Sequence, residues 1–267
     1  TITYSLSGTD ASSMSINSSS GVLTFNSAPD YETKSSYSAT VTANDGTNSS
    51  TQNITVNLTN LNDNTPSITS SATFSAAENQ TAIGTVTATD ADGDTLSYSL
   101  SGTDASSMSI NSSSGVLTFN SAPDYETKTS YTATVTASDG TNSATQDITV
   151  NVTNLNDNSP SFTSSATFSA AENQTAIGTV TATDVDGDTL SYSLSGTDAS
   201  SMSINSSSGV LIFNSAPDYE TKSSYSATVT ASDGTNSITQ NITVNITDVN
   251  ESPIFTSGAT FSAAENQ

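Results

Sequence analysis

Residues 131–137 read YTATVTA, and this stretch decides the class of fold that we expect. An apolar side chain at every odd position, from Tyr131 to Ala137, alternates with threonine at every even position. Such a period of two is typical of a β-strand with one buried and one solvated face, and β-branched threonine suits a pleated surface. The stretch therefore predicts a strand whose odd-numbered residues face a core.

The same alternation recurs on both sides of this stretch. It covers Thr73 to Ala76, Ile83 to Thr89, Leu96 to Leu100, Gly115 to Phe119 and Gln146 to Thr153. Turn-forming residues separate the segments, as in NSSSG at 111–115, and no segment shows a helical stripe. About seven short strands at this spacing predict an all-β fold, a Greek-key β-sandwich.

The chain is also an internal repeat. The glutamate of the motif AAENQ moves from Glu78 to Glu172, 94 positions on, and then to Glu265, 93 positions further. A unit of this length can close its own core, because an immunoglobulin-sized sandwich needs ~100 residues. We expect a linear array of seven-stranded Greek-key sandwiches. Its boundaries would be 1–64 (a repeat lacking its first strands), 65–158 and 159–252 (complete repeats), and 253–267 (the start of a further repeat).

Composition excludes several classes of function. The net charge is −23, with 26 acidic residues, three Lys or Arg and no His, so neither nucleic acid nor an anionic membrane surface is an expected partner. Cysteine is absent, which rules out disulfides and thiolate metal sites. Without His or Cys, a general base or nucleophile would have to come from carboxylate pairs or from Ser and Lys. We therefore expect that the protein is not an enzyme. No apolar run is long enough for membrane contact within this window.

The acidic residues gather in short motifs at predicted strand ends, whereas a generally solvated surface would scatter them. Carboxylate and amide oxygens in such clusters are ligands for hard divalent cations. Through the second repeat, the motifs are AAENQ with Glu78, ATDADGD with Asp90 and Asp92, PDYETK with Asp124 and Glu126, ASDG with Asp139, and NLNDN before Pro160.

In this order, the motifs resemble the calcium-binding motifs of cadherin repeats, in a bacterial cadherin-like style. The resemblance implies Ca²⁺ clusters between consecutive repeats. For the second junction it assigns Glu78, Asp124, Glu126, Asn156, Asp157, Asn158, Asp184, Asp186 and Asp233. Seven of these are carboxylates, and three Ca²⁺ would neutralise six of the seven charges.

The resemblance extends to the other two junctions. At the first it assigns Asp30, Glu32, Asn62, Asp63, Asn64, Asp90, Asp92 and Asp139. At the third it assigns Glu172, Asp218, Glu220, Asp248, Asn250 and Glu251. The chain departs from the family pattern at Asn60 and Asn154, where an Asp is usual, and at Glu251-Ser252 in place of Asp-Asn. Asp94 and Asp188 either add a ligand or close a turn, and we expect the turn.

The resemblance also implies a function, namely a calcium-stiffened extracellular module of a cell surface or secreted matrix, spacing an adhesin or assembling filaments. Its partners would be neighbouring repeats, copies of itself, and a cell-surface or glycan partner. A calcium-assisted carbohydrate-binding module is the alternative from another class. Lys34, Lys128 and Lys222 recur in PDYETK, where an isopeptide cross-link or a catalytic base is conceivable, but we expect solvated lysines at a strand edge.

Overall fold

The computed structural model describes residues 1–263 and 265. The regular structure over these residues is β-strand, apart from single turns of 3-10 helix at Ala11–Ser13, Ala105–Ser107 and Ala199–Ser201. No helix in this part of the chain is long and apolar enough to cross a membrane. The chain divides into two compact units between Thr153 and Asn154, and each is described by itself.

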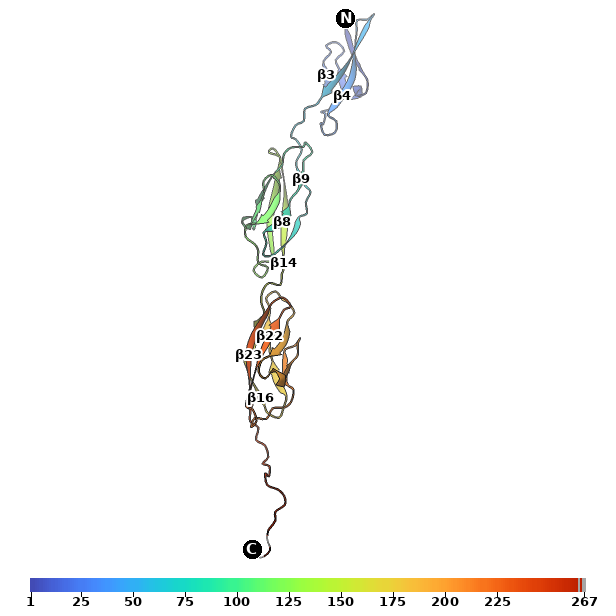
Figure 1. The fold of residues 1–267 in the computed structure, drawn as a ribbon. Coiled ribbons are helices and arrows are strands. Elements are labelled where there is room, and N and C mark those ends of the chain that lie inside the picture. The colour runs from blue at the N-terminus through green and yellow to red at the C-terminus, as the bar shows by residue number, and fades with distance from the viewer. Residues whose placement is uncertain (264, 266–267) are drawn as a thin grey trace. The chain divides into compact units, whose positions relative to one another are not determined.

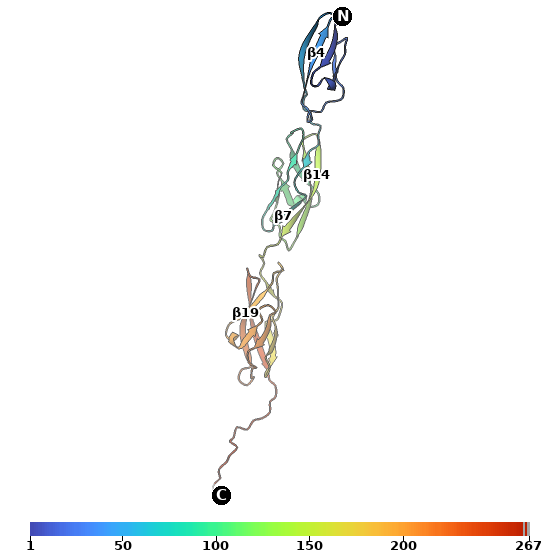
Figure 2. The same cartoon turned by 90° about the vertical axis from the view of Figure 1, so that its right-hand side faces the viewer.

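The second repeat, in the first unit, is a two-layered sandwich (Figure 1). Its strands are β6 (Ser67–Ile68), β7 (Thr73–Ala77), β8 (Ala82–Thr85), β9 (Ala88–Thr89), β10 (Ser97–Ser101), β11 (Met108–Ile110), β12 (Val116–Phe119), β13 (Ser130–Ser138) and β14 (Ser143–Thr153). One sheet has the order β10-β13-β14-β7 and the other β11-β12-β8, with β6 paired to β9. β7 runs parallel to β14, as Figure 2 shows, and the other pairs are antiparallel. If β6–β7 and β8–β9 each count as one interrupted strand, this is the predicted seven-stranded Greek-key sandwich.

The third repeat, in the second unit, has the same topology. Its strands are β15 (Ser161–Phe162), β16 (Thr167–Ala171), β17 (Ala176–Thr179), β18 (Ala182–Thr183), β19 (Ser191–Ser195), β20 (Met202–Ile204), β21 (Val210–Phe213), β22 (Ser224–Ser232) and β23 (Ser237–Thr247). The sheets are ordered β16-β23-β22-β19 and β17-β21-β20, with β15 paired to β18. Two copies of nearly the same sequence therefore give the same fold.

The first repeat holds the equivalents of the later strands only. These are β1 (Thr3–Ser7), β2 (Met14–Ile16), β3 (Leu23–Phe25), β4 (Ser36–Asn44) and β5 (Ser49–Asn57), in sheets β1-β4-β5 and β2-β3. Met14 and Ala39 are its buried apolar residues, while Phe25 is half-buried and packs edge-on against Tyr37 with ring centroids 4.9 Å apart.

The core of each complete repeat lies between the two sheets. In β13, the predicted alternation is confirmed, since Ala133, Val135 and Ala137 are buried. Leu117 from β12 and Val150 from β14 complete the core and are both 0% exposed. Burying such a side chain stabilises the fold by about 1.5–3 kcal/mol.

Three features of the second repeat differ from the strands that the sequence predicts. The single strand expected over 83–89 is divided into β8 and β9, because the chain changes its pairing partner there: β8 pairs with β12 up to the bond from the Val86 N–H to the Gly115 carbonyl (2.9 Å), and β9 pairs with β6. β6 (Ser67–Ile68) and β11 (Met108–Ile110) were not predicted, since two or three residues offer too little alternation to recognise.

The segment after β23 forms no strand in the described residues 253–263. Phe255 and Phe261, which match Phe162 and Phe168 of the third repeat, are 97% and 80% exposed, whereas Phe162 and Phe168 pack against a core. The assignment of 253–267 to a further repeat stays a prediction from sequence. Ala264, Asn266 and Gln267 lie outside the described residues.

Candidate calcium-binding sites

Three carboxylates of the second repeat meet in the loop that follows β9. Asp90, Asp92 and Asp94 each place one carboxylate oxygen within 4.8 Å of the others. The loop folds back at Gly93, whose φ of 80° is the left-handed conformation that glycine adopts readily, and Asp90 Oδ1 accepts the N–H of Asp92 (3.0 Å). Desolvation raises the pKa of Asp94, and the charges of Asp90, Asp92 and Asp139 raise it further.

Two oxygens in this region are buried without a hydrogen-bond donor. Asp90 Oδ2 and Asp139 Oδ2 accept no hydrogen bond from the described residues, and the same is true of Asp184 Oδ2 and Asp233 Oδ2 in the third repeat. Leaving a buried acceptor unpaired is costly, and a bound ion or water is the usual explanation for such a group. These four oxygens are the strongest structural indication of a cation site.

The other oxygen of Asp139 is well satisfied. Asp139 Oδ1 accepts the backbone N–H groups of Thr141 and Asn142, both at 2.6 Å. Burial desolvates the Asp139 carboxyl, but these hydrogen bonds outweigh that effect and hold its pKa below the ordinary value. The side chain is therefore an oriented anion with one oxygen left for a ligand.

The linker before the second repeat is tied to the same loop. Asp92 accepts the backbone N–H of Asn64 at Oδ2 and its side-chain amide at Oδ1, both at 2.8 Å, and the N–H of Asp63 at Oδ2 (3.1 Å). The Asn64 amide is the largest contribution that lowers the pKa of Asp92. The third repeat repeats this arrangement, with Asp186 accepting from Asn158 (2.8 Å twice) and from Asp157 (3.0 Å).

Several asparagines take part that the motifs did not single out as ligands. Asn60 and Asn154, the departures from the family pattern, donate to the carbonyls of Asp92 (2.8 Å) and Asp186 (2.7 Å), which an Asp could not do. Asn142 donates to Asn62 Oδ1 (3.2 Å) and to the Asn64 carbonyl (3.1 Å), and Asn62 donates to the Asp139 carbonyl (3.4 Å). In the third repeat, Asn236 and Asn156 make the matching contacts. The recurrence of Asn in the DGTN turn was the available sequence clue.

A second set of carboxylates lies at the opposite end of the second repeat. Glu78, at the end of β7, is 2% exposed and accepts the N–H of Tyr125 (2.8 Å). Its neighbour Asn79 has φ of 62° and donates its N–H to the Pro123 carbonyl (3.0 Å). These bonds hold the PDYETK loop against β7. Glu78, Asp124 and Glu126 then place carboxylate oxygens within 4.8 Å of one another.

The third repeat has the equivalent cluster. It comprises Glu172, Glu220, Asp248 and Glu251. Glu172 is 2% exposed and accepts the N–H groups of Tyr219 (2.9 Å) and Val249 (2.7 Å), which lower its pKa. The Asp218 carboxylate accepts from Glu220 and Thr221 within its own loop, and Asn250 is exposed beyond β23.

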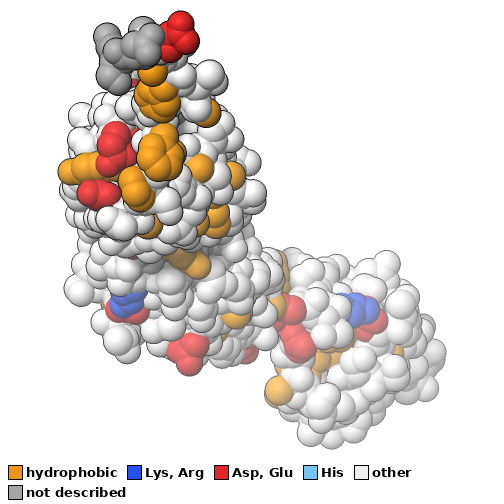
Figure 3. Space-filling view, turned by 90° about the horizontal axis from the view of Figure 1, so that it is seen from below, with side chains coloured by type: hydrophobic (Ala, Val, Ile, Leu, Met, Phe, Trp, Pro, Cys, Tyr) orange, Lys and Arg blue, Asp and Glu red, His pale blue; other side chains and the backbone are white. Residues whose placement is uncertain are grey.

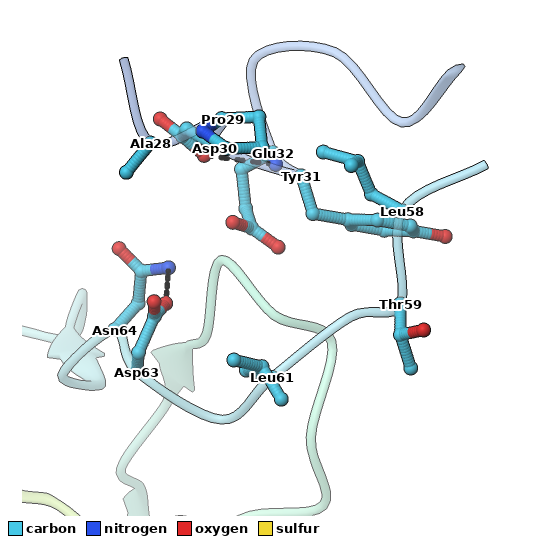
Figure 4. Close-up of a pocket in the computed structure, with 10 residues that line it drawn as sticks. All are labelled: Ala28, Pro29, Asp30, Tyr31, Glu32, Leu58, Thr59, Leu61, Asp63 and Asn64. Carbon is cyan, nitrogen blue, oxygen red and sulfur yellow. Dashed lines mark hydrogen bonds between the residues drawn. The ribbon is translucent and has the colours of Figure 1, made fainter. Parts of the chain in front are cut away.

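At the first junction, within the first unit, Glu32, Asp63 and Asp92 come together. Each offers a carboxylate oxygen within 4.8 Å of the others. Figure 4 shows Glu32 pointing from the PDYETK loop toward Asp63 and Asn64, across an open pocket of about 620 Å³. Desolvation raises the pKa of Glu32, and the neighbouring carboxylates of Asp30 and Asp92 add to the rise. Asp30 itself accepts from Thr33 Oγ1 (2.8 Å) and the Glu32 N–H (3.0 Å).

The chemistry of these donors fits calcium. The converging groups are carboxylate, amide and carbonyl oxygens, the ligands that Ca²⁺ takes in sets of six to eight, with no sulfur or imidazole. The buried unpartnered oxygens of Asp90 and Asp139 are the positions that most need a cation. The donor set therefore suits the ion that the sequence motifs predict.

From the sequence we expected the recurring lysines to be solvated at a strand edge, and the structure corrects this expectation. Lys34, Lys128 and Lys222 are 40–42% exposed, but each pairs through Nζ with an aspartate 24 residues earlier, Asp10, Asp104 or Asp198. In Figure 3, the visible blue lysines lie directly against red carboxylates. The sequence missed the pairing because a contact between distant loops leaves no local pattern.

Two segments of the chain match a known protein family. The family model described as cadherin domain matches residues 72–153 and 166–247. The chain belongs to the cadherin family. Its two complete β-sandwiches are thus cadherin repeats.

Relatives share this cadherin chain's sequence over most of its length. The protocadherin-like wing polarity protein stan of Drosophila melanogaster is 30% identical over 87% of this chain and 7% of that protein. The mouse cadherin EGF LAG seven-pass G-type receptor 2 is 34% identical over 94% of this chain and 10% of that protein. The solved structure of mouse cadherin-23 EC22-24 is 28% identical, covers 93% of this chain and 86% of that chain, and has a TM-score of 0.71.

The similarity to cadherins indicates the general class of protein to which the chain belongs. It spans a tenth or less of the length of the two curated relatives named above. Cadherin-domain proteins are extracellular or cell-surface adhesion proteins and not enzymes, and their repeats generally bind calcium at the junctions.

Proposed function

We propose that this cadherin segment binds Ca²⁺ at its repeat junctions and serves as a calcium-stiffened extracellular module for adhesion or spacing. The observation that carries the proposal is the set of buried carboxylate oxygens to which no described residue donates a hydrogen bond, on Asp90 and Asp139 in one repeat and on Asp184 and Asp233 in the next. Oxygens in this position have a reason to remain unpaired if they serve as ligands.

The charges of the clustered side chains support the same conclusion. At the first junction, Glu32, Asp63 and Asp92 come from the loop of one repeat, the linker, and the loop of the next. Three like charges at such distances repel one another, and the raised pKa of Glu32 reflects part of that repulsion. Bound Ca²⁺ would supply the compensating positive charge. The three carboxylates would then hold their segments together instead of driving them apart.

The repeat extends this proposal to the other junctions. Glu78, Asp124 and Glu126 would provide the base ligands for the second junction, with Asn156, Asp157, Asn158, Asp184, Asp186 and Asp233 as the remaining ligands. At the third junction, the ligands would be Glu172, Asp218, Glu220, Asp248, Asn250 and Glu251. At the first, Asp30, Asn62, Asn64, Asp90 and Asp139 would join the three carboxylates already named.

Spacing is the role that near-identical repeats suit best, since a single specialised copy would be enough for one specific binding site. We assign the segment to the cell surface or a secreted matrix, as part of a surface adhesin or filament whose partners include copies of itself. A bacterial adhesin is the finer assignment, based on the near identity of the repeats and the ATDADGD form of the motif. Finding the gene for this chain in a bacterial or in a eukaryotic genome tests the bacterial assignment.

The proposal is tested by calcium calorimetry together with small-angle scattering of the 267-residue chain in EDTA and in millimolar CaCl₂. We expect saturable uptake with Kd of ~10⁻⁴ to 10⁻³ M, the range of extracellular calcium modules, and a longer, stiffer particle with calcium. Calcium uptake without any change in the dimensions of the particle would reject the proposed stiffening and would still support calcium binding. Absence of uptake would reject the proposed function and direct attention to glycan-binding screens without calcium.

A further inference from the structure

All three basic residues of the chain occupy one structural position. Lys34, Lys128 and Lys222 each end the loop that begins with Pro-Asp-Tyr-Glu, the loop that carries two proposed ligands. The lysine N–H closes this loop by donating to the carbonyl of its first aspartate, as Lys128 does to Asp124 (2.9 Å). A chain with net charge −23 thus places its only cationic side chains beside its ligand loops.

Each lysine is fixed by two contacts from its Nζ. In the second repeat, Lys128 pairs with Asp104 Oδ1 and lies 4.5 Å from the centroid of the Tyr131 ring. That ring packs edge-on against Phe119 of the core, with centroids 4.9 Å apart. The same contacts recur at Lys34 and Lys222, which lie 4.9 and 4.8 Å from their tyrosine rings.

The aspartate partner is itself anchored to the sandwich. The Asp104 side chain is 13% exposed, its Oδ2 accepts the N–H of Thr132 in β13 (2.9 Å), and the Asp104 N–H donates to the Thr132 carbonyl (3.0 Å). The Lys128 ammonium holds the pKa of Asp104 below its ordinary value. Through this aspartate, the lysine attaches the ligand loop to the first residues of a core strand.

The two ends of the loop are therefore held by different groups. The Tyr125 N–H is bound by Glu78, itself a proposed ligand, and the Pro123 carbonyl by the Asn79 N–H. At the far end, Asp124 accepts the N–H (3.2 Å) and the hydroxyl (2.9 Å) of Thr127 within the loop, and Lys128 adds the side-chain contact to Asp104. With both ends fixed, Asp124 and Glu126 keep carboxylate oxygens within 4.8 Å of each other despite their mutual repulsion, and a loop that is already ordered costs less to order when an ion binds.

An isopeptide bond between lysine and aspartate does not fit this geometry. Attack by Nζ on Cγ with loss of water requires a neutral amine and a protonated carboxyl, whereas this pair is partly solvated and carries opposite charges. An ion pair that positions the loop is the chemistry these groups support.

We propose that Lys34, Lys128 and Lys222 are positioning residues for calcium: each anchors the loop of two ligands to an aspartate of the sandwich and thereby raises calcium affinity. This inference rests on the proposed calcium binding. It makes a counterintuitive prediction about sign, because a cation near the site should by simple electrostatics weaken the binding of Ca²⁺.

The test compares the full chain with its triple variants Lys34→Met/Lys128→Met/Lys222→Met and Lys34→Arg/Lys128→Arg/Lys222→Arg, by CaCl₂ calorimetry. Methionine keeps the aliphatic stem and removes the charge, whereas arginine keeps the charge and the contact with the tyrosine. We expect the Met variant to bind Ca²⁺ about 3-fold to 10-fold more weakly and the Arg variant to bind close to wild type. Circular dichroism in EDTA checks that each variant folds.

Equal or tighter calcium binding by the Met variant would overturn the inference and leave the lysines as structural groups that merely reduce the negative charge. If the Met variant does not fold, the triple variant Lys34→Gln/Lys128→Gln/Lys222→Gln replaces it. The calcium affinity of that variant is then compared with that of the wild-type chain in the same way. Absence of calcium uptake by the wild-type chain would instead reject the proposed function, and the inference would be rejected with it.

Discussion

At the scale of the residue, the unpaired oxygens of Asp139 and its equivalents are the clearest sign of a cation site. Asp139 is fixed by two 2.6 Å hydrogen bonds to one oxygen, while the other is buried and accepts no hydrogen bond within the described part of the chain. Asp233 repeats both features in the third repeat. A carboxylate that is held in one orientation by hydrogen bonds to one oxygen, with its other oxygen available, is suited to bind a cation.

Replacing Asp139 by asparagine should weaken calcium binding at the first junction by roughly 10-fold to 100-fold, because a charged ligand becomes a neutral one in a fixed position. Calcium calorimetry on the full chain measures the loss. Asp147→Asn is the matched control, since Asp147 is an exposed carboxylate on β14 bonded to Thr134, and the other repeats have Asn53 and Asn241 there. Equal effects of the two variants would show that Asp139 contributes only general charge.

Asp94 has two alternative roles, closing a turn or binding the ion, and stability measurements in the absence of calcium begin the test between them. Its pKa is raised by desolvation and by neighbouring carboxylates, so ionised Asp94 destabilises the calcium-free fold. This destabilisation is fully present above the raised folded-state pKa and is lost as the pH falls below the unfolded value of about 4. Asp94→Asn should therefore raise the thermal midpoint in EDTA at about pH 7 and leave it unchanged near pH 3.

Calcium affinity completes the test of Asp94. If Asp94 only closes the turn at Gly93, the Asn variant keeps the affinity of the wild-type chain. A marked loss of affinity in calorimetry would instead make Asp94 a ligand and reverse our expectation.

At the scale of the element, the hairpin between β11 and β12 shows how the backbone sets the packing of the two complete repeats. Gly115 has φ of 70° and its carbonyl accepts the N–H of Val86, which belongs to the break between β8 and β9. A Cβ at Gly115 would lie 2.1 Å from the Val86 carbonyl oxygen. The turn is thus restricted to glycine by conformation and also by the neighbouring strand.

Gly115→Ala should destabilise the second repeat by ~3 kcal/mol, since the left-handed backbone is strained and the Val86 contact must open. Gly21→Ala is the internal control. Gly21 has φ of 72°, but its Cβ would meet only the Tyr4 side chain at 3.3 Å, so ~1–2 kcal/mol is expected. Hydrogen exchange resolved by segment, at β8 and β12 for one variant and at β2 and β3 for the other, measures the two losses. A larger loss at Gly21 would contradict the steric explanation.

At the scale of the whole molecule, charge dominates. The 26 acidic residues against three lysines leave most carboxylates without a cationic partner, and the lysines are already committed to Asp10, Asp104 and Asp198. Like charges brought together at repeat ends oppose folding and association unless cations compensate them. Stability of the whole chain should therefore depend on calcium.

Calcium at roughly 100 times its Kd should raise the free energy of unfolding by about 2.7 kcal/mol for each independent site, because the ion binds only the folded chain. Thermal unfolding in CaCl₂ and in EDTA measures the difference, with MgCl₂ as control, since Mg²⁺ demands a stricter octahedral geometry. The difference should shrink as the pH falls through about 4, with Glu32 protonating first because its pKa is raised, and Asp92 and Asp139 last because their pKa values are lowered. Equal stabilisation by both ions would indicate charge screening instead of specific sites.

The sequence by itself determined the all-β fold, the repeat and the acidic motifs, because each is a local pattern: alternation in YTATVTA, turn residues, and short clusters of Asp and Glu. Resemblance to the cadherin family then named the candidate ligands among those acids. Only the tertiary structure decided how Lys128 pairs with Asp104, how Asn60 and Asn142 hold the linker, and that β8 and β9 part at Val86. These side-chain contacts join residues 24 to 78 positions apart, and the strand break falls where the chain changes its pairing partner from β12 to β6. No local pattern records which loops the folded sheets bring together.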